Sequence, residues 1–256
     1  MITIALANRK GGNAKTTTAH ALGAALKNKG FKVLLVDLDA QANLTLTLGA
    51  DVSGAHGYSL EVILKEKPLA DAIQQTSSGL DVLGACAKNA SSDTLMSDII
   101  GKEYRLREAL ASADGYDYAI IDCPPALGVL TLNALTAADF VLLPCQTDMY
   151  SIQAIGQMIL TINTVKQYLN HNLKTIGAML VRYNPRPIVN REAQKMLESA
   201  LQANNVPILK STIRECSAIR EAQTFRQDIF AYAPRSNAAK DYADAAEEIM
   251  EVINNG

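Results

Sequence analysis

The stretch NRKGGNAKTT, residues 8–17, decides how this chain of 256 residues folds. It follows the apolar run Met1–Ala7, which is typical of a buried strand, and leads into Thr16–Lys29, where apolar residues recur at helical spacing. In a glycine-rich turn between a strand and a helix, backbone N–H groups point inward and the helix N-terminus adds positive potential. The stretch therefore predicts a phosphate-binding loop, in which Gly11 and Gly12 let the backbone approach the phosphates closely.

The side chains after the glycines suit the same chemistry. In such a loop Lys15 reaches the β- and γ-phosphates, the Thr16 hydroxyl holds Mg²⁺, and Thr17 adds a hydroxyl near the α-phosphate. The loop departs twice from the pattern GxxxxGK[ST], because Arg9 and Ala14 stand where glycines are expected. A plain glycine-rich turn with a surface lysine is the alternative interpretation.

Two acidic motifs help to decide between these interpretations. DLDAQAN (residues 37–43) ends the predicted strand Lys32–Asp37, and DCPP (residues 122–125) ends the predicted strand Tyr118–Asp122. Ligands of an open parallel sheet bind beyond the carboxyl ends of its strands, so we expect all three motifs to meet in one crevice. Carboxylates there bind Mg²⁺ directly or through water and orient the attacking water. A single strand-end aspartate could simply cap a turn, but three such motifs together favour a phosphate site.

Along the whole chain, short apolar runs alternate with longer amphipathic ones, which is the pattern of βαβ units. We therefore expect an α/β fold, a single-domain P-loop NTPase over residues 1–256, with a mostly parallel twisted sheet and helices on both faces. Further strands are predicted at Leu80–Gly84, Asp139–Pro144 and Thr175–Val181, and Val206–Leu209 is a weaker candidate. Helices are predicted near Glu103–Ala111, Leu130–Thr136, Ser151–Leu169, Ile188–Ala203 and Asn237–Ile253. The segment 49–98 is the least regular.

Composition excludes several classes of protein. The net charge of −2 argues against binding nucleic acid through overall basicity, and a hydrophobic content of 48% argues against disorder. No apolar stretch is long enough for a signal peptide or a membrane span. The four cysteines are widely spaced without a CxxC pair, so we expect reduced, mostly buried thiols in a cytoplasmic protein.

On these motifs the sequence resembles the deviant-Walker ATPases of the ParA/MinD type, and most of all the small, Soj-like ParA proteins that partition DNA. The resemblance covers essentially the whole chain, through KGGNAKTT, DLDAQAN, IIDCPP, LTLNAL and EAQTFRQDIFAYAPRSNAAKDY. The family loop reads KGGxGKT[ST], so Lys10 matches its signature lysine and Ala14 remains a departure. No helix-turn-helix extension is expected before the first strand.

The resemblance implies a role for each motif residue. Lys15 is the P-loop lysine and Thr16 the Mg²⁺ ligand, while Asp122 holds the metal through water. Asp39 positions the hydrolytic water, and Lys10 reaches across an ATP-sandwiched homodimer to the partner's nucleotide. The expected cofactors are ATP and Mg²⁺, and hydrolysis is expected to be slow. The residues expected to bind nucleotide are Lys10, Gly11, Gly12, Asn13, Ala14, Lys15, Thr16, Thr17 and Asn184. Asn184 contacts adenine in this interpretation, although a plain turn at Asn184-Pro185 is the equal alternative.

The partners follow from charge and resemblance together. Between Arg182 and Arg226 eight basic residues oppose four acidic ones, which is typical either of a phosphate-binding face or of an ordinary solvated helix face. The resemblance favours nonspecific DNA binding by the ATP dimer, with Arg214 and Arg220 as the candidate contacts, and a ParB-like centromere-binding partner that stimulates hydrolysis. The protein is then associated with the nucleoid, whereas its cargo (chromosome, plasmid, mobile element or protein assembly) stays open.

Three alternatives remain. A MinD-like positioning ATPase would cycle on a membrane, but the polar face of the last helix is acidic, so no membrane binding is expected. An ATP-dependent amide or carboxylate ligase would turn over a small substrate without DNA. A non-hydrolysing scaffold is conceivable because of Ala14.

Overall fold

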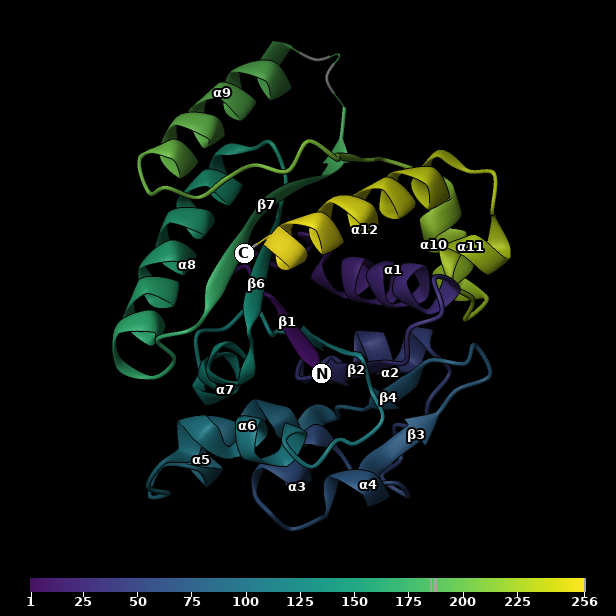
Figure 1. Ribbon diagram of the computed structural model, residues 1–256, viewed down its shortest axis with the longest axis vertical. Helices are drawn as coiled ribbons and strands as arrows, with labels where there is room; N and C mark the ends of the chain where they lie inside the picture. The colour runs from purple at the N-terminus through teal and green to yellow at the C-terminus, as the bar shows by residue number, and fades with distance from the viewer. Residues whose placement is uncertain (185, 187, 256) are drawn as a thin grey trace.

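The computed structural model describes residues 1–184, 186 and 188–255, with side chains for all of these except 188–191. Its strands are β1 (Ile2–Leu6), β2 (Val33–Asp37), β3 (Ile73–Gln75), β4 (Asp81–Leu83), β5 (Tyr118–Asp122), β6 (Phe140–Cys145), β7 (Lys174–Tyr183) and β8 (Ile213–Arg214). They form a sheet in the order β3-β4-β2-β5-β1-β6-β7-β8 (Figure 1). Each described pairing is parallel apart from the antiparallel pair β3–β4. The predicted α/β fold with a mostly parallel sheet is confirmed.

The helices cover both faces of the sheet, as predicted. Their bounds are α1 (Lys15–Asn28), α2 (Asn43–Thr47), α3 (Ser59–Ile63), α4 (Leu69–Ala72), α5 (Ser92–Leu95), α6 (Arg105–Leu110), α7 (Val129–Ala137), α8 (Met149–Tyr168), α9 (Ile188–Gln202), α10 (Ser217–Thr224), α11 (Ile229–Tyr232) and α12 (Asn237–Asn255). Short 3₁₀ turns lie at Ala87–Ser91 and Lys102–Tyr104. Figure 1 shows α7, α8 and α9 on one side of the central strands and α1, α10, α11 and α12 on the other.

Two separate cores hold these layers together, one on each face of the sheet. Strand β1 contributes to both, because alternate side chains of a strand point to opposite faces. Ile4 and Leu6 pack with α1 and α12, while Ala5 packs with α7 and α8. All of these positions are fully buried, which accounts for the continuous apolar runs that predicted the strands.

Some predicted elements differ from the structure. Val206–Leu209 is not a strand, and Ile208 forms only an isolated bridge with Ala178. Pro207 explains this, because it lacks the N–H that would continue the ladder. Its carbonyl also lies 2.6 Å from where a Cβ on Gly177 would stand, so the two segments approach closely only because Gly177 has no side chain. The edge strand β3 has three residues, too few to show an alternating pattern.

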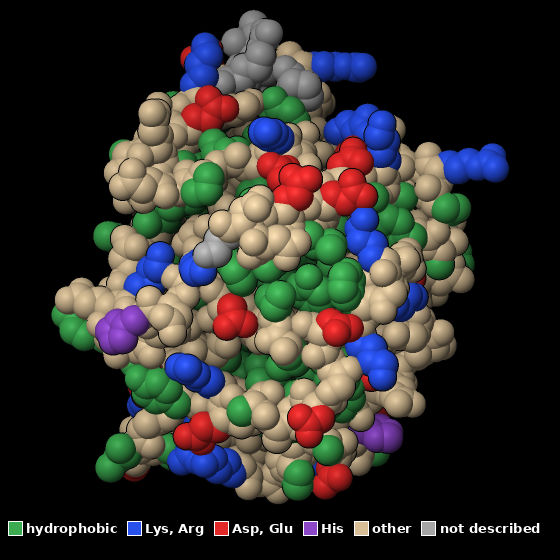
Figure 2. All heavy atoms as spheres, viewed as in Figure 1, with side chains coloured by type: hydrophobic (Ala, Val, Ile, Leu, Met, Phe, Trp, Pro, Cys, Tyr) green, Lys and Arg blue, Asp and Glu red, His purple; other side chains and the backbone are tan. Residues whose placement is uncertain are grey.

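Helix α12 carries acidic side chains on its outward face. Asp244, Glu247, Glu248 and Glu251 line a shallow groove there, and Figure 2 shows acidic side chains grouped over this helix. Of these, Glu248 also accepts hydrogen bonds from the backbone N–H groups of Lys210 and Ser211. No described helix combines the length and the apolar character that crossing a membrane requires.

Candidate nucleotide-binding site

The loop between β1 and α1 has the backbone shape of a phosphate cradle. Nothing lies within 4 Å of where a Cβ on Gly11 or Gly12 would stand, so both glycines border open space. Ala14 lies at φ +55° in the left-handed region, and its carbonyl accepts the Thr18 N–H at 2.8 Å. A residue with a Cβ pays about 1 kcal/mol for this conformation. The departure at Ala14 therefore strains the loop without closing the cavity that it lines.

The start of α1 meets the end of β5 at a candidate metal position. The Thr16 hydroxyl donates to Asp122 Oδ2 at 2.6 Å, whereas Asp122 Oδ1 is buried and has no partner among the described residues. An orphaned carboxylate oxygen beside a threonine hydroxyl suits a hard cation such as Mg²⁺, which keeps several waters and binds through few protein oxygens. The described residues hold no cluster of three His, Cys, Asp or Glu side chains, so Thr16 and Asp122 would share such an ion with water and phosphate.

Two buried carboxylates at the strand ends also favour the binding of a cation between or beside them. Asp37 and Asp122 are opposite one another in the register of β2 and β5, and both are buried. Burial, and then the neighbouring Asp37, raise the pKa of Asp122 to about 8. Burial likewise raises the pKa of Asp37 to about 6, against the hydrogen bonds that its carboxylate accepts from Thr45. A bound cation would relieve this repulsion and favour the ionised forms.

Asp39, in the turn after β2, lines the same cavity as the glycines of the phosphate loop. Its backbone N–H donates to Asp37 Oδ1 at 3.1 Å, and its own Oδ1 accepts the Gln41 N–H at 3.0 Å. These bonds hold the turn so that Asp39 lines the cavity together with Asn43 and Thr47 from α2. The structure therefore brings together the loop, Asp39 and Asp122, which the sequence predicted to converge.

Lys10 points elsewhere, toward the start of α8. Its Nζ bonds Asp148 Oδ2 at 2.5 Å and Ser151 Oγ at 3.3 Å. Asp148 also caps α8 by accepting the Ser151 N–H at 3.0 Å. Partial burial opposes ionisation of Asp148, yet the bond from Lys10 lowers its pKa overall. In this single chain the charge of Lys10 is thus neutralised at the start of its own α8, and its reach to a partner's nucleotide stays a prediction.

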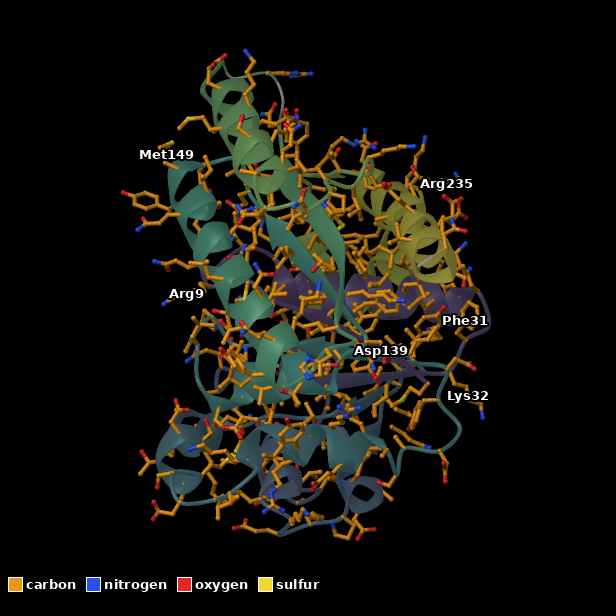
Figure 3. All side chains as sticks on the ribbon, turned by 60° about the vertical axis from the view of Figure 1, so that its left-hand side comes forward. Arg9, Phe31, Lys32, Asp139, Met149 and Arg235 are labelled. Carbon is orange, nitrogen blue, oxygen red and sulfur yellow. The ribbon has the colours of Figure 1, made fainter. Side chains whose placement is uncertain are left out.

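The loop has further contacts with the segment from β6 to α8. Gln146 Nε2 donates to the Gly12 carbonyl at 2.7 Å, and Asn13, which is buried, lies with its Oδ1 3.4 Å from Ser151 Oγ. Arg9 donates to Gln157 Oε1 at 2.5 Å and lies beside α8, whose first residue Met149 is exposed (Figure 3). This side of the loop is therefore held by one ion pair and several hydrogen bonds.

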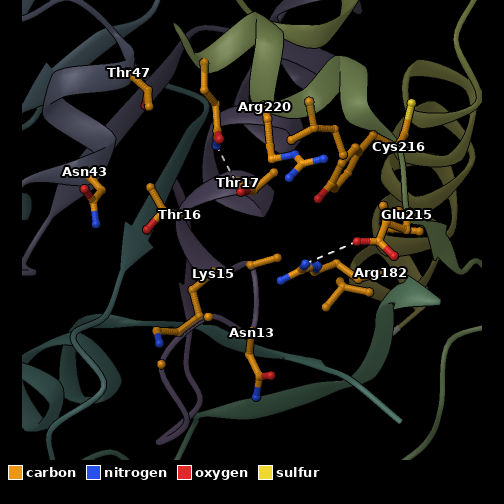
Figure 4. A pocket seen from close by; sticks show the side chains of 18 of the residues that line it. Asn13, Lys15, Thr16, Thr17, Asn43, Thr47, Arg182, Glu215, Cys216 and Arg220 are labelled. Atoms are coloured by element: carbon orange, nitrogen blue, oxygen red, sulfur yellow. Dashed lines mark hydrogen bonds and ion pairs between the residues drawn. The ribbon is translucent and has the colours of Figure 1, made fainter. Parts of the chain in front are cut away.

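The opposite side borders a cavity of about 390 Å³, large enough for a nucleotide. It lies between the loop and a wall built by the end of β7, β8, α10 and α12. Figure 4 shows Lys15, Thr16 and Thr17 facing Arg182, Glu215 and Arg220 across it. Gln223 Nε2 on α10 donates to Thr17 Oγ1 at 3.0 Å and joins the wall to α1.

One predicted ligand residue, Asn184, does not line the cavity, and one residue that does line it was not predicted. Asn184 is not among the described residues that line the cavity, and its Oδ1 accepts the Arg186 N–H at 3.1 Å in a local turn. The sequence reasoning missed Arg182, which lines the cavity at φ +51°, next to a register shift in β7. Its signals in the sequence were its position just after a predicted strand and its place at the start of the basic region.

The two candidate DNA contacts lie on the cavity wall. Arg214 donates through Nε and Nη2 to Asp241, with Nη2 2.6 Å from Oδ1, and its guanidinium is therefore already neutralised. Asp241 lies on α12 but, unlike the acidic residues of its outward face, it is buried. Arg220 lines the cavity from α10. The side chain of Arg191, part of the same basic region, lies outside the described residues.

Comparison with known proteins agrees with this geometry. A family described as an AAA domain matches residues 1–175. The sporulation initiation inhibitor protein Soj of Bacillus subtilis is 36% identical over 248 residues, which cover 96% of this chain and 97% of Soj. The chain belongs to the ParA/MinD family of deviant-Walker ATPases.

Solved structures in the same comparison share the fold. One, described as cobyrinic acid a,c-diamide synthase from Mycobacterium smegmatis with bound ADP and magnesium, has a TM-score of 0.83 and 36% identity, covering 96% of this chain and 93% of that one. The cell division ATPase MinD of Pyrococcus furiosus has a TM-score of 0.79 and 29% identity, covering 98% and 99%. The predicted P-loop NTPase fold is confirmed.

Proposed function

We propose that this chain is a ParA-type partitioning ATPase that binds ATP with Mg²⁺ and hydrolyses it slowly. The observation that carries the proposal is the pairing of Thr16 with Asp122 beside an open glycine cradle, which leaves one buried carboxylate oxygen for a metal. The relative from M. smegmatis, described with ADP and magnesium, supports the same ligands.

The residues divide the work of phosphoryl transfer to water. Gly11, Gly12 and the first turn of α1 would bind the phosphates through backbone N–H groups, and Lys15 would neutralise the β- and γ-phosphates. Bound Mg²⁺ would neutralise the charge that develops on the phosphates. Asp39, held by its turn where it lines the cavity, would orient the attacking water. Little else is needed, because this reaction depends on positioning and charge.

Dimerisation would then link ATP binding to the binding of DNA and of a partner protein. Lys10 would leave Asp148 and reach the nucleotide of a second copy, so the ATP-bound state and the homodimer form one linked equilibrium. The similarity to partitioning proteins supports nonspecific DNA as the surface that the dimer binds, and a ParB-like protein as the partner that stimulates hydrolysis and release.

DNA retention at graded salt tests this proposal directly. The wild-type chain with Mg²⁺ and ATP is expected to bind DNA, with an affinity that falls steeply as salt rises. Lys15→Gln is expected to lower ATP affinity about 100-fold, the effect of losing a charged phosphate contact, and to abolish retention. Lys65→Gln is the control, since this lysine forms a surface ion pair with Glu108 away from the cavity. Retention that survives Lys15→Gln would defeat the proposal.

Two alternatives give different results in the same assay. A MinD-like protein would bind anionic vesicles and not DNA, but the acidic outward face of α12 would be repelled by such lipids. A ligase, as the description of the M. smegmatis relative suggests for that protein, would hydrolyse ATP only with a small carboxylate substrate. ATP turnover without such a substrate, stimulated by DNA and a partner, excludes the ligase.

A further inference from the structure

Three arginines line the cavity from its C-terminal wall, and they differ in how their charge is balanced. Arg182 pairs with Glu215 at 3.2 Å, and Arg214 pairs with the buried Asp241 at 2.6 Å. In the part of the chain that the structure describes, no carboxylate lies within ion-pair distance of Arg220. Its neighbour Glu221 is turned away and accepts the Tyr232 hydroxyl at 3.0 Å. Among the described residues, Arg220 is thus the arginine of this wall that has no carboxylate partner and can bind an anionic ligand directly.

The position of Arg220 is fixed by the packing of its helix. On α10, Ala222 is buried in the core, while Ile219, Arg220 and Gln223 line the cavity. The spacing of these three places them on one helical face. Gln223 holds that face against α1 through its bond to Thr17 Oγ1 at 3.0 Å. Figure 4 shows the Arg220 side chain directed from α10 into the cavity, toward the region of Thr17.

The ligand group that lies near Thr17 follows from the order of the loop. Lys15 and the glycines serve the β- and γ-phosphates, and the second hydroxyl of the motif lies near the α-phosphate. A guanidinium next to it can donate two parallel hydrogen bonds to phosphate oxygens, which are stronger than neutral hydrogen bonds. No existing ion pair of the described chain has to be broken first.

We propose that Arg220 binds the α-phosphate of the nucleotide held by its own chain, and is not a DNA contact. This inference rests on the proposed function, because it assumes that the cavity holds a nucleoside di- or triphosphate. It assigns α10 a role in ligand binding, because this helix lines the cavity on the side of the loop opposite the Lys10–Asp148 ion pair.

Nucleotide titrations of three variants test the inference. Binding of Mg²⁺–ADP and of AMP is measured by calorimetry for the wild type, Arg220→Ala and Arg220→Lys. The matched control is Arg226→Ala, which removes the same charge from an exposed residue beyond the end of α10 that does not line the cavity. Arg220→Ala is expected to weaken ADP about tenfold or more, the effect of one charge-assisted pair. Arg220→Lys recovers part of this loss, and Arg226→Ala stays within about twofold of the wild type, as expected for an exposed charge.

The two ligands locate the contact. AMP and ADP share the α-phosphate, so Arg220→Ala should weaken both by the same factor; a loss confined to ADP would move the contact to the β-phosphate and overturn the assignment. Unchanged ADP affinity together with lost DNA retention would show that Arg220 contacts DNA instead, and would overturn the proposal. If Arg220→Ala fails to fold, Arg220→Lys and Arg220→Gln carry the same comparison. Failure of the wild type to bind ADP is a different outcome, because it rejects the proposed function itself.

Discussion

Lys10 and Arg220, on opposite sides of the phosphate loop, differ in how their charge is balanced. On the side of α8, Lys10 is bonded to Asp148 and Ser151, and Arg9 is bonded to Gln157. On the side of α10, Arg220 faces the cavity without an ion pair among the described residues. Both sides are basic in sequence, but in the single chain Lys10 is ion-paired, whereas Arg220 faces the cavity without a carboxylate partner among the described residues.

The difference separates two kinds of phosphate contact. A cation already paired with a carboxylate must lose that partner before it binds another anion, so its use can depend on assembly. A cation without a partner is ready to bind at once. We therefore expect Arg220 to act in the monomer and Lys10 to act only in the dimer.

The largest effect is expected for Lys10→Ala, measured on the ATP-dependent dimer, and it separates the two roles. Lys10→Ala should weaken the ATP-dependent dimer about 100-fold, the effect of removing one partner of a buried charge contact, and leave the monomer's ADP affinity within about twofold. Arg220→Ala should do the reverse, with its main effect on nucleotide affinity. Light scattering in an Asp39→Ala background, where ATP persists, measures the dimer. Equal losses of ADP affinity in both variants would remove the contrast between the two sides.

A second prediction concerns the carboxylate between the two sides. The folded-state pKa of Asp122 is about 8, above the ordinary value of 3.8, so the folded protein keeps a proton that the unfolded chain has lost. The contribution of Asp122 to stability without ligand should therefore fall as pH rises from 4 to 8. In the range from pH 6.5 to 8 Asp122 makes the largest contribution, since the folded-state pKa values of Asp37 and His20 lie lower, at about 6 and 4.

Thermal denaturation over that range checks this prediction. The wild type should lose stability with rising pH relative to Asp122→Asn, which has no proton to lose. Mg²⁺–ADP should stabilise the wild type more at pH 8 than at pH 6.5, because the metal binds the ionised carboxylate. Parallel curves for wild type and Asp122→Asn would contradict the assignment.

A smaller effect should follow when the bond that holds Lys10 is weakened. Asp148→Asn keeps a side chain that caps α8 but removes the charge facing Lys10. Because the pair is partly exposed, the ATP-dependent dimer should form only about threefold more readily. The control is Asp98→Asn, an exposed residue on another part of the surface. A weaker dimer in Asp148→Asn would mean that Asp148 supports the assembled state.

The smallest effect belongs to the loop itself. Ala14→Gly should relieve the left-handed strain at φ +55° while adding flexibility to the unfolded chain, for a net gain of about 0.5 kcal/mol in the free energy of unfolding. Denaturant unfolding measures this gain. Ala200→Gly, within α9, should instead lose about 1 kcal/mol. A loss at both positions would show that Ala14 is not strained.

The sequence predicted the fold and the centre of the site because both depend on local patterns. Buried parallel strands require continuous apolar runs, and the phosphate loop must join one such strand to a helix. Asp39 and Asp122 were found because each follows a strand, and parallel strands end at one edge of the sheet. The edge strand β3 was missed since its three residues carry no periodic signal.

The C-terminal wall was harder to predict. Asn184 was expected at the ligand, but the bulge in β7 brings Arg182 to the cavity instead. Arg214 and Arg220 look alike in sequence, six residues apart in one basic region. Their difference comes from Asp241, 27 residues beyond Arg214, which pairs with Arg214 and not with Arg220.

From its own residues, then, the chain dictates a strand, a glycine turn and a helix, and with them a place for phosphate, because each feature is set by neighbours within a few positions. Which cations stay available at that place is decided only by the tertiary structure. Asp148 and Asp241 reach Lys10 and Arg214 across long stretches of chain, and a charge is neutralised by whichever carboxylate packing brings close, whatever the distance in sequence.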